Sequence, residues 1–576
     1  MPFLKKILSC FIVMGVQVQK VDTKPFAGQK PGTSGLRKRV PEFQQEHYTE
    51  NFIQAVIDGG LGWKKKGSSL VVGGDGRFLC KEAVNVIIQI AAANGISRLI
   101  VGQDGFLSTP AVSSLIRNLK VDGGIILTAS HNPGGPKGDF GIKFNCENGG
   151  PAPDHVTDAI HKITTEISSY SICRDINVDS GIIGNHQFDV DGMGKFIVDV
   201  IDSVEDYVEL MKTIFDFPTM REYIKGSGGN QLRILIDSMH GATGPYVSTI
   251  FNDLLGCVGT DLLRTVPKPD FGGCHPDPNL TYAKDLVDRM RVGEVDMGAA
   301  FDGDGDRNMI LGKSAFFVCP SDSLAVIANH IDCIPYFKNR NVAGFARSMP
   351  TAAAVDLVAK KKGLKAYETP TGWKYFGNLM DDGRIALCGE ESFGTGSIHI
   401  REKDGIWALL AWLQILAVKR KSVEEIVKEH WAEYGRNVFT RYDYENVESG
   451  GANLLMTFLE ASMNASKGKE LSANGVTYKV AHTDNFEYTD PVDGSVAKKQ
   501  GLRVLFEDGS RLVFRLSGTG SAGATIRLYV DSYVSPHDTN KLYSSAQDLL
   551  KPLVLIALDL CKMEQFTGRK APTVIT

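Results

Sequence analysis

The chain has 576 residues, of which 43% are hydrophobic and 23% are charged, and its formal net charge is -4. At about 150 residues per domain, this length predicts roughly four domains and excludes one single core. This net charge gives no sign of the basic domain that is expected of a nucleic-acid-binding protein. The 10 cysteines form no Cys-x-x-Cys pair, which indicates reduced thiols in a cytoplasmic protein.

The N-terminus, "MPFLKKILSCFIVMGVQV", has the order of a signal peptide, because Lys5 and Lys6 precede an apolar run. The run is too short to span a bilayer, and no small-x-small cleavage site follows it. Translation from Met14 would instead begin with "MGVQVQKV", which is typical of a first strand. We therefore expect residues 1–13 to be an extension of a cytoplasmic protein without stable membrane association.

From about Val18, apolar strands alternate with helical segments, which is typical of an α/β fold. The first unit is predicted to contain a strand that ends in a loop over 69–77, a helix over 81–94, a strand over 98–105 and a helix within 108–119 that is capped by Thr109. A second unit of this kind begins near Gln231, and a third begins near Asn341.

Three segments share a pattern in which an apolar strand ends in a polar, glycine-containing loop. They are "GGIILTASHNP", "DMGAAFDGDGDR" and "GRIALCGEESFG". Because ligands of open α/β sheets collect beyond the carboxyl ends of strands, we expect these three loops to face one cleft. After Gly435 the pattern changes to strands with turns and then a long helix over about 541–561, which predicts a separate α+β domain.

Asp302, Asp304 and Asp306 alternate with glycines in "DGDGDR" and form the strongest local motif. An EF-hand is excluded because Arg307 and Lys313 occupy the positions of its glycine and glutamate. Mg²⁺ is usually held by a few carboxylates together with phosphate or water oxygens. The motif therefore predicts a magnesium site, with Arg307 able to bind a phosphate oxygen.

The segment "FRLSGTGSAGATIR" combines small hydroxylated residues with glycines between Arg515 and Arg527. A strand rather than a helix follows it, and Ala524 stands where a P-loop has its lysine, so neither nucleotide-binding motif is satisfied. Exposed backbone N–H groups beside two arginines are typical of a site for a phosphate monoester. Glu390 and Ser392, in turn, are suited to sugar hydroxyls.

A candidate serine in "TASHNPGG", a magnesium loop and a separate phosphate loop together predict phosphoryl transfer. Ser130 and His131 are direct neighbours, so an extended chain would point them to opposite faces. Lys143 and Lys403 are both candidates for the general acid or base. Transfer from ATP would need a nucleotide-binding loop, and none is evident.

Four segments, "TASHNPGG", "AAFDGDGDRNMILG", "GEESFGTGS" and "FRLSGTGSAGATIRLY", closely resemble those of the phosphoglucomutases in the α-D-phosphohexomutase superfamily. The resemblance runs from about Val18 to the C-terminal "PTVIT". It implies interconversion of α-D-glucose 1-phosphate and glucose 6-phosphate through glucose 1,6-bisphosphate, with one Mg²⁺ per chain. It also implies three related α/β domains and a C-terminal α+β domain of the TATA-binding-protein-like type around a central cleft, divided at residues 1–13, 14–206, 207–318, 319–435 and 436–576.

The resemblance also assigns roles to individual residues. Ser130 would be the phosphorylated serine and, with Asp302, Asp304 and Asp306, a metal ligand. The transferring phosphoryl group would be surrounded by His131, Lys143, Arg307 and Lys403. The sugar would be contacted by Arg37, Thr371, Gly372, Glu390 and Ser392, and the non-reacting phosphate by Arg515, Ser517, Gly518, Thr519 and Arg527. The family pattern has an aspartate where this chain has Ile398, which bears on the hydrogen bonds around His399 and Lys403.

The sequence is also compatible with two other functional interpretations. A phosphomannomutase or a dual-specificity phosphohexomutase would use the same residues on another sugar. A non-catalytic, cytoskeleton-associated relative has the same fold but altered motif loops, whereas the serine and aspartate loops are intact here. In each catalytic case we expect a monomer that acts on small sugar phosphates and binds no nucleic acid.

Overall fold

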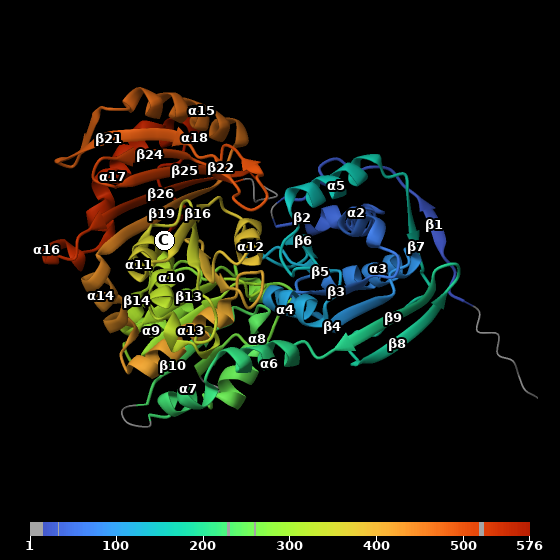
Figure 1. The fold of residues 1–576 in the computed structure, drawn as a ribbon. Coiled ribbons are helices and arrows are strands. Elements are labelled where there is room, and N and C mark those ends of the chain that lie inside the picture. The colour runs from blue at the N-terminus through green and yellow to red at the C-terminus, as the bar shows by residue number, and fades with distance from the viewer. Residues whose placement is uncertain (1–14, 33, 227–230, 258–260, 518–522) are drawn as a thin grey trace, which may run out of the picture.

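The computed structural model describes residues 15–32, 34–226, 231–257, 261–517 and 523–576. Four groups of strands and helices follow one another along the chain. In Figure 1 the first group, blue to teal, lies at the right, and the last group, orange to red, lies above the green and yellow middle groups. Among the described residues, no helix is both long and apolar enough to cross a membrane.

The first group is built on a seven-stranded sheet of order β2-β6-β5-β3-β4-β9-β8, in which β5, β3, β4 and β9 are parallel. The strands are β2 (Leu36–Arg39), β3 (Ser69–Gly74), β4 (Arg98–Phe106), β5 (Gly123–Leu127), β6 (Asp139–Cys146), β8 (Gly184–Val190) and β9 (Gly194–Ile201). The helices are α1 (Val40–Phe43), α2 (Tyr48–Leu61), α3 (Cys80–Ala93), α4 (Thr109–Leu119) and α5 (Asp154–Glu166), and β1 (Gln19–Asp22) pairs separately with β7 (Ser169–Ile172).

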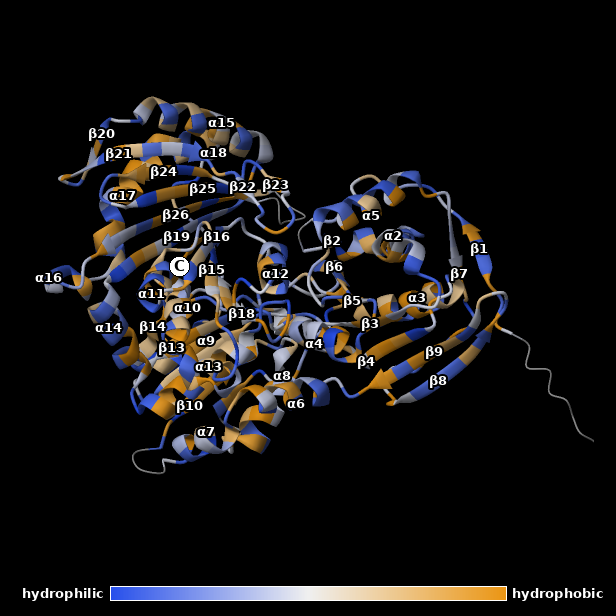
Figure 2. Cartoon of the chain, viewed as in Figure 1, coloured by the Kyte–Doolittle hydropathy of each residue, from blue (hydrophilic) through white to orange (hydrophobic). Residues whose placement is uncertain are grey.

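The central strands of this sheet are apolar on both faces, as expected for strands covered by helices on each side. Side chains alternate between the faces, so Leu70 and Val72 belong to one core and Val71 belongs to another. The core with Leu70 also contains residues of α2 and α3, and the core with Val71 contains residues of α4 and of the other three groups. Figure 2 shows β3 and β4 largely orange and the edge strand β8 mostly blue.

The second and third groups repeat this plan on smaller sheets, of order β11-β10-β12-β13-β14 and β16-β15-β17-β18. The second contains α6 (Glu205–Ile214), α7 (Phe217–Ile224), β10 (Ile234–Asp237), α8 (Thr243–Val247), β11 (Leu262–Leu263), α9 (Lys284–Arg291), β12 (Met297–Phe301), β13 (Asn308–Gly312) and β14 (Phe316–Phe317). The third contains α10 (Pro320–Asn329), β15 (Gly344–Ser348), α11 (Ala354–Lys362), β16 (Lys365–Thr369), α12 (Trp373–Asp381), β17 (Leu387–Glu390), β18 (Gly394–Ser397), α13 (Gly405–Lys419) and α14 (Val423–Tyr434).

The fourth group starts at Arg436 and has a seven-stranded sheet of order β20-β21-β24-β25-β26-β19-β27. Its strands are β19 (Arg436–Val447), β20 (Glu470–Ala473), β21 (Val476–Asn485), β24 (Leu502–Phe506), β25 (Arg511–Ser517), β26 (Ala524–Val534) and β27 (Val574–Ile575), with a small pair formed by β22 (Tyr488–Thr489) and β23 (Val496–Ala497). Its helices are α15 (Ser449–Ser466), α16 (Thr539–Leu542), α17 (Ala546–Cys561) and α18 (Met563–Thr567). The predicted α+β architecture of the C-terminal part of the chain is therefore confirmed.

Two predictions about helix ends are wrong. Ser108, not Thr109, caps α4, because Ser108 has the extended backbone of an N-cap and its hydroxyl accepts from the N–H of Ala111 at 3.2 Å. The Thr109 hydroxyl instead donates to Asp304 at 2.7 Å. The C-terminal helix is divided into α16 and α17, because the backbone at Ser545 is extended.

Candidate active site

Ser130 lies just beyond the end of β5 in a tightly held loop. It is 2% exposed and has a left-handed backbone (φ 54). Its N–H donates to the Thr128 hydroxyl at 2.8 Å, and that hydroxyl donates to Asp75 at 2.6 Å. Arg77, which is paired with Asp75, donates from Nη2 to the Ser130 carbonyl at 2.8 Å. These buried contacts fix the direction of the serine side chain.

The three aspartates of "DGDGDR" follow β12 and gather in front of Ser130. One carboxylate oxygen from each lies within 4.8 Å of the others. Ser130 Oγ donates to Asp302 at 2.9 Å, and burial, reinforced by Asp304 and Asp306, raises the pKa of Asp302 well above its usual value. Asp304 Oδ1 and Asp306 Oδ1 are buried without a hydrogen-bond partner among the described residues. A set of hard, close and unsatisfied oxygens fits a divalent cation.

Arg307 and His131 border this acidic group. Arg307 is held only loosely, with Nη1 3.6 Å from Asp277 and Nε 3.9 Å from Asp306. Its buried Nε has no hydrogen-bond partner in the described part of the chain, which leaves a donor for an incoming phosphate oxygen. The His131 ring lies 6.0 Å from that of His275. Burial, followed by the charge of Arg307, lowers the pKa of His131 and favours a neutral ring.

The two candidate lysines have different partners. Lys403 Nζ lies 3.1 Å from Asp306 Oδ2; burial acts against its ammonium form, but Asp306 raises the pKa of Lys403 overall. Lys143 donates to Glu402, which also accepts from Asn145 at 2.9 Å. Burial raises the pKa of Glu402. The contact between Lys143 and Glu402 joins the first group of elements to the third.

The third group supplies the two loops that were predicted to bind a sugar. Glu390 ends β17, and its Oε1 accepts from the N–H of Gly372 at 3.2 Å, so the two loops are in contact. Gly372 precedes α12 with φ 123, a backbone that only glycine adopts readily. Burial raises the pKa of Glu390. Trp373 Nε1 is buried next to them and lacks a hydrogen-bond partner among the described atoms.

The fourth group supplies Arg515, Ser517 and Arg527 from β25 and β26. Arg515 Nε donates to the carbonyl of Gln500 at 3.2 Å, and Arg527 Nε lies 3.8 Å from Asp443. The predicted phosphate ligands Gly518 and Thr519 lie outside the described residues.

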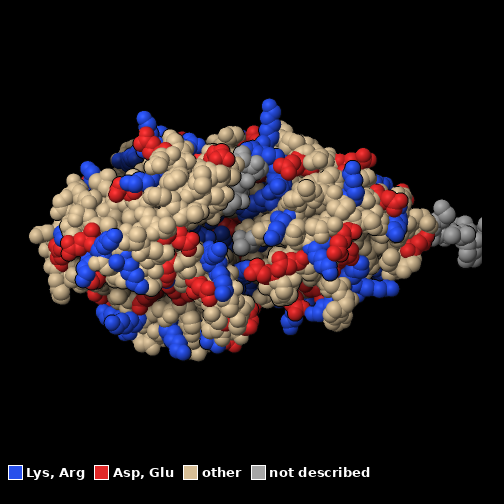
Figure 3. Space-filling model, turned by 90° about the horizontal axis from the view of Figure 1, so that it is seen from above, with Lys and Arg blue, Asp and Glu red and all other residues tan. Residues whose placement is uncertain are grey.

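All four groups line one cavity of about 230 Å³. Seen from above in Figure 3, a hollow separates the two sides of the molecule, and Lys and Arg side chains gather beside it. Asp302 lies behind the wall, in contact with Ser130. The predicted residues that line this cavity are Arg37, Ser130, His131, Lys143, Asp304, Asp306, Arg307, Thr371, Gly372, Glu390, Ser392, Lys403, Arg515, Ser517 and Arg527.

Ile398 does not interrupt the hydrogen bonds near Lys403. His399 bonds Ser397 through Nδ1 at 2.7 Å and Asp404 through Nε2 at 2.9 Å, and its ring stacks on Trp407. Ile398 itself is half-buried and packs against the apolar core.

A buried ion-pair chain that connects the third and fourth groups was missed in the sequence. Arg441 Nη1 donates to Glu391 at 2.8 Å, and its Nε lies 3.0 Å from Asp443, the partner of Arg527. The available signal was "RYD" in the segment after Gly435, because residues two apart in a strand point to the same face. Glu402, Asp75 and Arg77 carried no such signal.

The comparisons with known proteins match the whole arrangement. Family models of the phosphoglucomutase/phosphomannomutase α/β/α domains I, II and III match residues 28–171, 205–314 and 320–434. A model of the phosphoglucomutase-1 C-terminal domain matches residues 436–573. The chain therefore belongs to the phosphoglucomutase/phosphomannomutase family, a class of multidomain α/β phosphotransferases.

Within this family, the similarity is to phosphoglucomutases. Phosphoglucomutase 1 of Drosophila melanogaster is 59% identical over 98% of this chain and 100% of its own length, and phosphoglucomutase-1 of Homo sapiens is 59% identical over 97% and 100%. The open form of the phosphoglucomutase parafusin from Paramecium has a TM-score of 0.86 and 48% identity over 98% of this chain and 100% of its own. The function of the chain is that of a phosphoglucomutase.

Proposed function

We propose that the chain interconverts α-D-glucose 1-phosphate and glucose 6-phosphate, with Ser130 as the phosphoryl carrier. The observation that carries this proposal is that Ser130, whose Oγ donates to Asp302, lines the same cavity as Arg515 and Arg527. This arrangement supports one site for a reacting phosphate and another for a second phosphate. A phosphatase would have no use for the second.

The reaction begins with Ser130 phosphorylated and glucose 1-phosphate bound. The 6-hydroxyl oxygen attacks the phosphorus, the bond to Ser130 Oγ breaks, and glucose 1,6-bisphosphate forms. The bisphosphate turns around, so that its 1-phosphate faces Ser130. Ser130 Oγ then attacks that phosphorus, the bond to the sugar O1 breaks, and glucose 6-phosphate leaves the restored phosphoenzyme.

We propose that the pair formed by Lys143 and Glu402 accepts the hydroxyl proton. Lys143 Nζ takes the proton as one of its own passes to Glu402, whose buried carboxyl has a raised pKa. Lys403 remains an ammonium beside Asp306 and, with Arg307, offsets the negative charge of the phosphoryl group. In the second transfer the same pair returns a proton to the sugar oxygen.

We further propose that Asp302, Asp304, Asp306 and the phosphorylated Ser130 would hold one Mg²⁺. The unsatisfied carboxylate oxygens described above support this assignment. When bound, the ion would neutralise charge on the transferring phosphoryl group.

The remaining predicted residues are proposed to hold the substrate. Arg37, Thr371, Gly372, Glu390 and Ser392 would contact the sugar, and Arg515, Ser517, Gly518, Thr519 and Arg527 the phosphate that does not react. The proposed domains remain 14–206, 207–318, 319–435 and 436–576. We expect a cytoplasmic monomer, because one chain supplies all the predicted residues and its described cysteines are free thiols.

The test is a coupled assay for glucose 6-phosphate with Mg²⁺ and a trace of glucose 1,6-bisphosphate. We expect Ser130→Ala to remove turnover and Ser392→Ala to lower it only partly. Full activity of Ser130→Ala would refute the carrier role. Equal rates on mannose 1-phosphate and glucose 1-phosphate would instead favour the dual-specificity alternative.

A further inference from the structure

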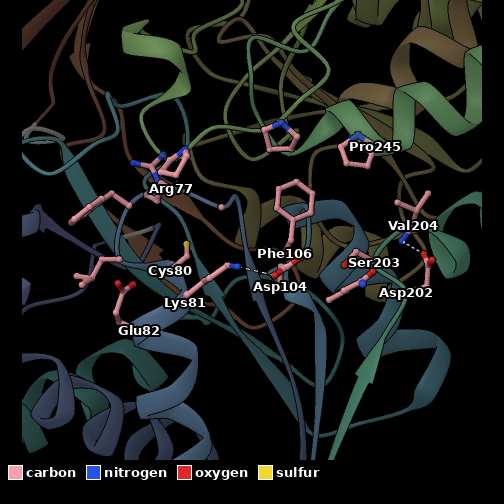
Figure 4. Close-up of a pocket in the computed structure, with 16 residues that line it drawn as sticks. Arg77, Cys80, Lys81, Glu82, Asp104, Phe106, Asp202, Ser203, Val204 and Pro245 are labelled. Atoms are coloured by element: carbon pink, nitrogen blue, oxygen red, sulfur yellow. Dashed lines mark hydrogen bonds and ion pairs between the residues drawn. The ribbon is translucent and has the colours of Figure 1, made fainter. Parts of the chain in front are cut away.

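A second cavity, of about 620 Å³, lies between the first and second groups of elements, away from the cleft. Its volume falls in the range of roughly 300–1,000 Å³ that is typical of small-molecule sites. The loop after β3, the end of β4 and residues 202–204 form one wall. The other wall contains Pro245, Pro267 and Pro269 from the second group. Residues from the two walls surround one space in Figure 4.

Much of this cavity is apolar. Phe78, Leu79, Phe106 and Val204 line it opposite the prolines, and Figure 4 shows Phe106, Val204 and Pro245 around the same space. Aromatic, aliphatic and proline surfaces at a boundary between domains are typical of a site that encloses the apolar body of a ligand.

The charged side chains that line the cavity carry a net negative charge. Arg77 is paired with the buried Asp75 and Lys81 with Asp104 at 2.7 Å, which leaves the carboxylates of Glu82 and Asp202. Asp202 accepts from the backbone N–H of Val204 at 2.7 Å and from that of the next residue, and these contacts do not cancel its charge. A ligand with one cationic group therefore complements the lining.

The wall also contains residues with strained backbones. Leu79 has φ 81 and Asp104 has φ 58, a left-handed conformation that costs a non-glycine residue about 1–3 kcal/mol. Such residues collect at ligand clamps and switch regions. Their presence here supports a role for the cavity beyond that of a packing gap.

One segment joins the cavity to the phosphoserine loop. Arg77 lines the cavity, donates to the Ser130 carbonyl and lies over the Phe271 ring at 5.1 Å. The N–H of the next residue, Phe78, donates to the carbonyl of Pro269 at 2.9 Å. A ligand that displaces Phe78 from Pro269 would therefore disturb the support of Ser130.

We propose that this interdomain cavity is a regulatory site for a small molecule with an apolar body and one cationic group. Binding lowers turnover by moving the support of Ser130 and does not compete with the sugar phosphate. The charge and shape of the lining define the ligand class as arylalkylamines, and the proposal stands whichever sugar the enzyme prefers.

The test uses 4-phenylbutylamine as the probe and 4-phenylbutyrate as its matched anion, with the full chain. We expect calorimetric titration to show binding of the amine at least about tenfold tighter than binding of the anion, a difference of 1.4 kcal/mol. We also expect the amine to lower kcat at an unchanged KM for glucose 1-phosphate. Equal binding of the two probes, no binding of the amine, or competition with the substrate would overturn the proposal.

Two variants place the binding in this cavity. Val204→Trp fills it and is expected to remove amine binding, whereas Val292→Trp, at a position that is 69% exposed on the second group, is the matched control. Glu82→Gln keeps the packing and is expected to weaken amine binding several-fold without affecting activity in the absence of amine. Unchanged amine affinity in Glu82→Gln, or in a folded Val204→Trp, would contradict the assignment.

Discussion

At the scale of single residues, the buried carboxylates of this protein lie in two different kinds of surroundings. Asp302, Asp304 and Asp306 gather where we propose that a cation and a phosphate bind, whereas Asp322 lies in the first turn of α10. Trp431 Nε1 donates to Asp322 at 3.0 Å, but its other oxygen has no hydrogen-bond partner among the described residues. Burial raises the pKa of Asp322 to about 6.

Asp322→Asn is expected to stabilise the protein at neutral pH. Because the folded pKa of about 6 exceeds the ordinary value of 3.8, this carboxyl supports folding fully only below pH 3.8 and loses that contribution as the pH rises to about 6. The loss is about 3 kcal/mol. Calorimetric melting should show a gain in Tm for Asp322→Asn above pH 6 that shrinks toward pH 4. The exposed Asp332→Asn serves as the control, and an equal gain at both pH values would contradict the expectation.

Glu402→Gln tests the proposed proton acceptor. The variant keeps an oxygen for Lys143 and Asn145 but cannot take the proton, so we expect kcat to fall by roughly 100-fold with little change in KM. The part of the pH–rate profile that reports ionisation of the proton acceptor should be absent in this variant. A rise in KM with unchanged kcat would mean that Glu402 only holds the first and third groups together.

At the scale of elements, most of the fold was predictable because the central strands are apolar runs that end in glycine-rich loops. The helix at 81–94 was placed within one residue of α3, and the strand at 98–105 within one residue of β4. The cap at Ser108 and the division at Ser545 were not predictable. Adjacent serine and threonine residues offer equivalent capping groups, and the choice between them depends on tertiary contacts. The pair of Arg441 with Glu391 was missed because 50 residues separate the two partners in the sequence.

The chain of Glu391, Arg441 and Asp443 links the loop that is proposed to contact the sugar to Arg527, which is proposed to hold phosphate. Removing the cation leaves the buried Glu391 without its charged partner and leaves Asp443 with Arg527, 3.8 Å away. We expect Arg441→Met to raise KM for glucose 1-phosphate at least about tenfold, equivalent to 1.4 kcal/mol, and to change kcat less. Initial-rate kinetics over a range of substrate concentrations would measure both.

The matched control for Arg441→Met is Arg503→Met. Arg503 also joins the third and fourth groups, through Glu368 at 3.3 Å, but it does not line the cleft. Its KM should remain close to that of the unmodified protein. An equal rise in KM for both variants would show that any loosening of the interface weakens the substrate site.

At the scale of the whole molecule, the acidic group lies where three parts of the chain meet. Ser130 comes from the first group, the aspartates from the second and Lys403 from the third. A cation there would relieve repulsion among buried carboxylates and so would hold these parts together. The family resemblance already divided the expected ligands between two domains, and the ion pair of Lys403 with Asp306 adds the third part of the chain.

Mg²⁺ is accordingly expected to raise Tm as well as activity. At a concentration of 100 Kd, a ligand that binds only the folded state stabilises it by about 2.7 kcal/mol. Melting curves with increasing Mg²⁺ should move upward, and the movement should be much smaller in Asp304→Asn. A Tm that is independent of Mg²⁺ in the unmodified protein would refute a folded-state metal site at these aspartates.

The first sheet has one face in a core of its own and the other in a core that continues through the remaining groups. Amide hydrogen exchange should therefore proceed in two steps. Amides of α2 and α3 are expected to exchange when the first group's own core opens. This opening should require a lower free energy than opening of the shared core, on which exchange of the amides of β3 and α4 depends. We therefore expect the first group to behave as two cooperative units, of which the outer one, with α2 and α3, opens at the lower free energy.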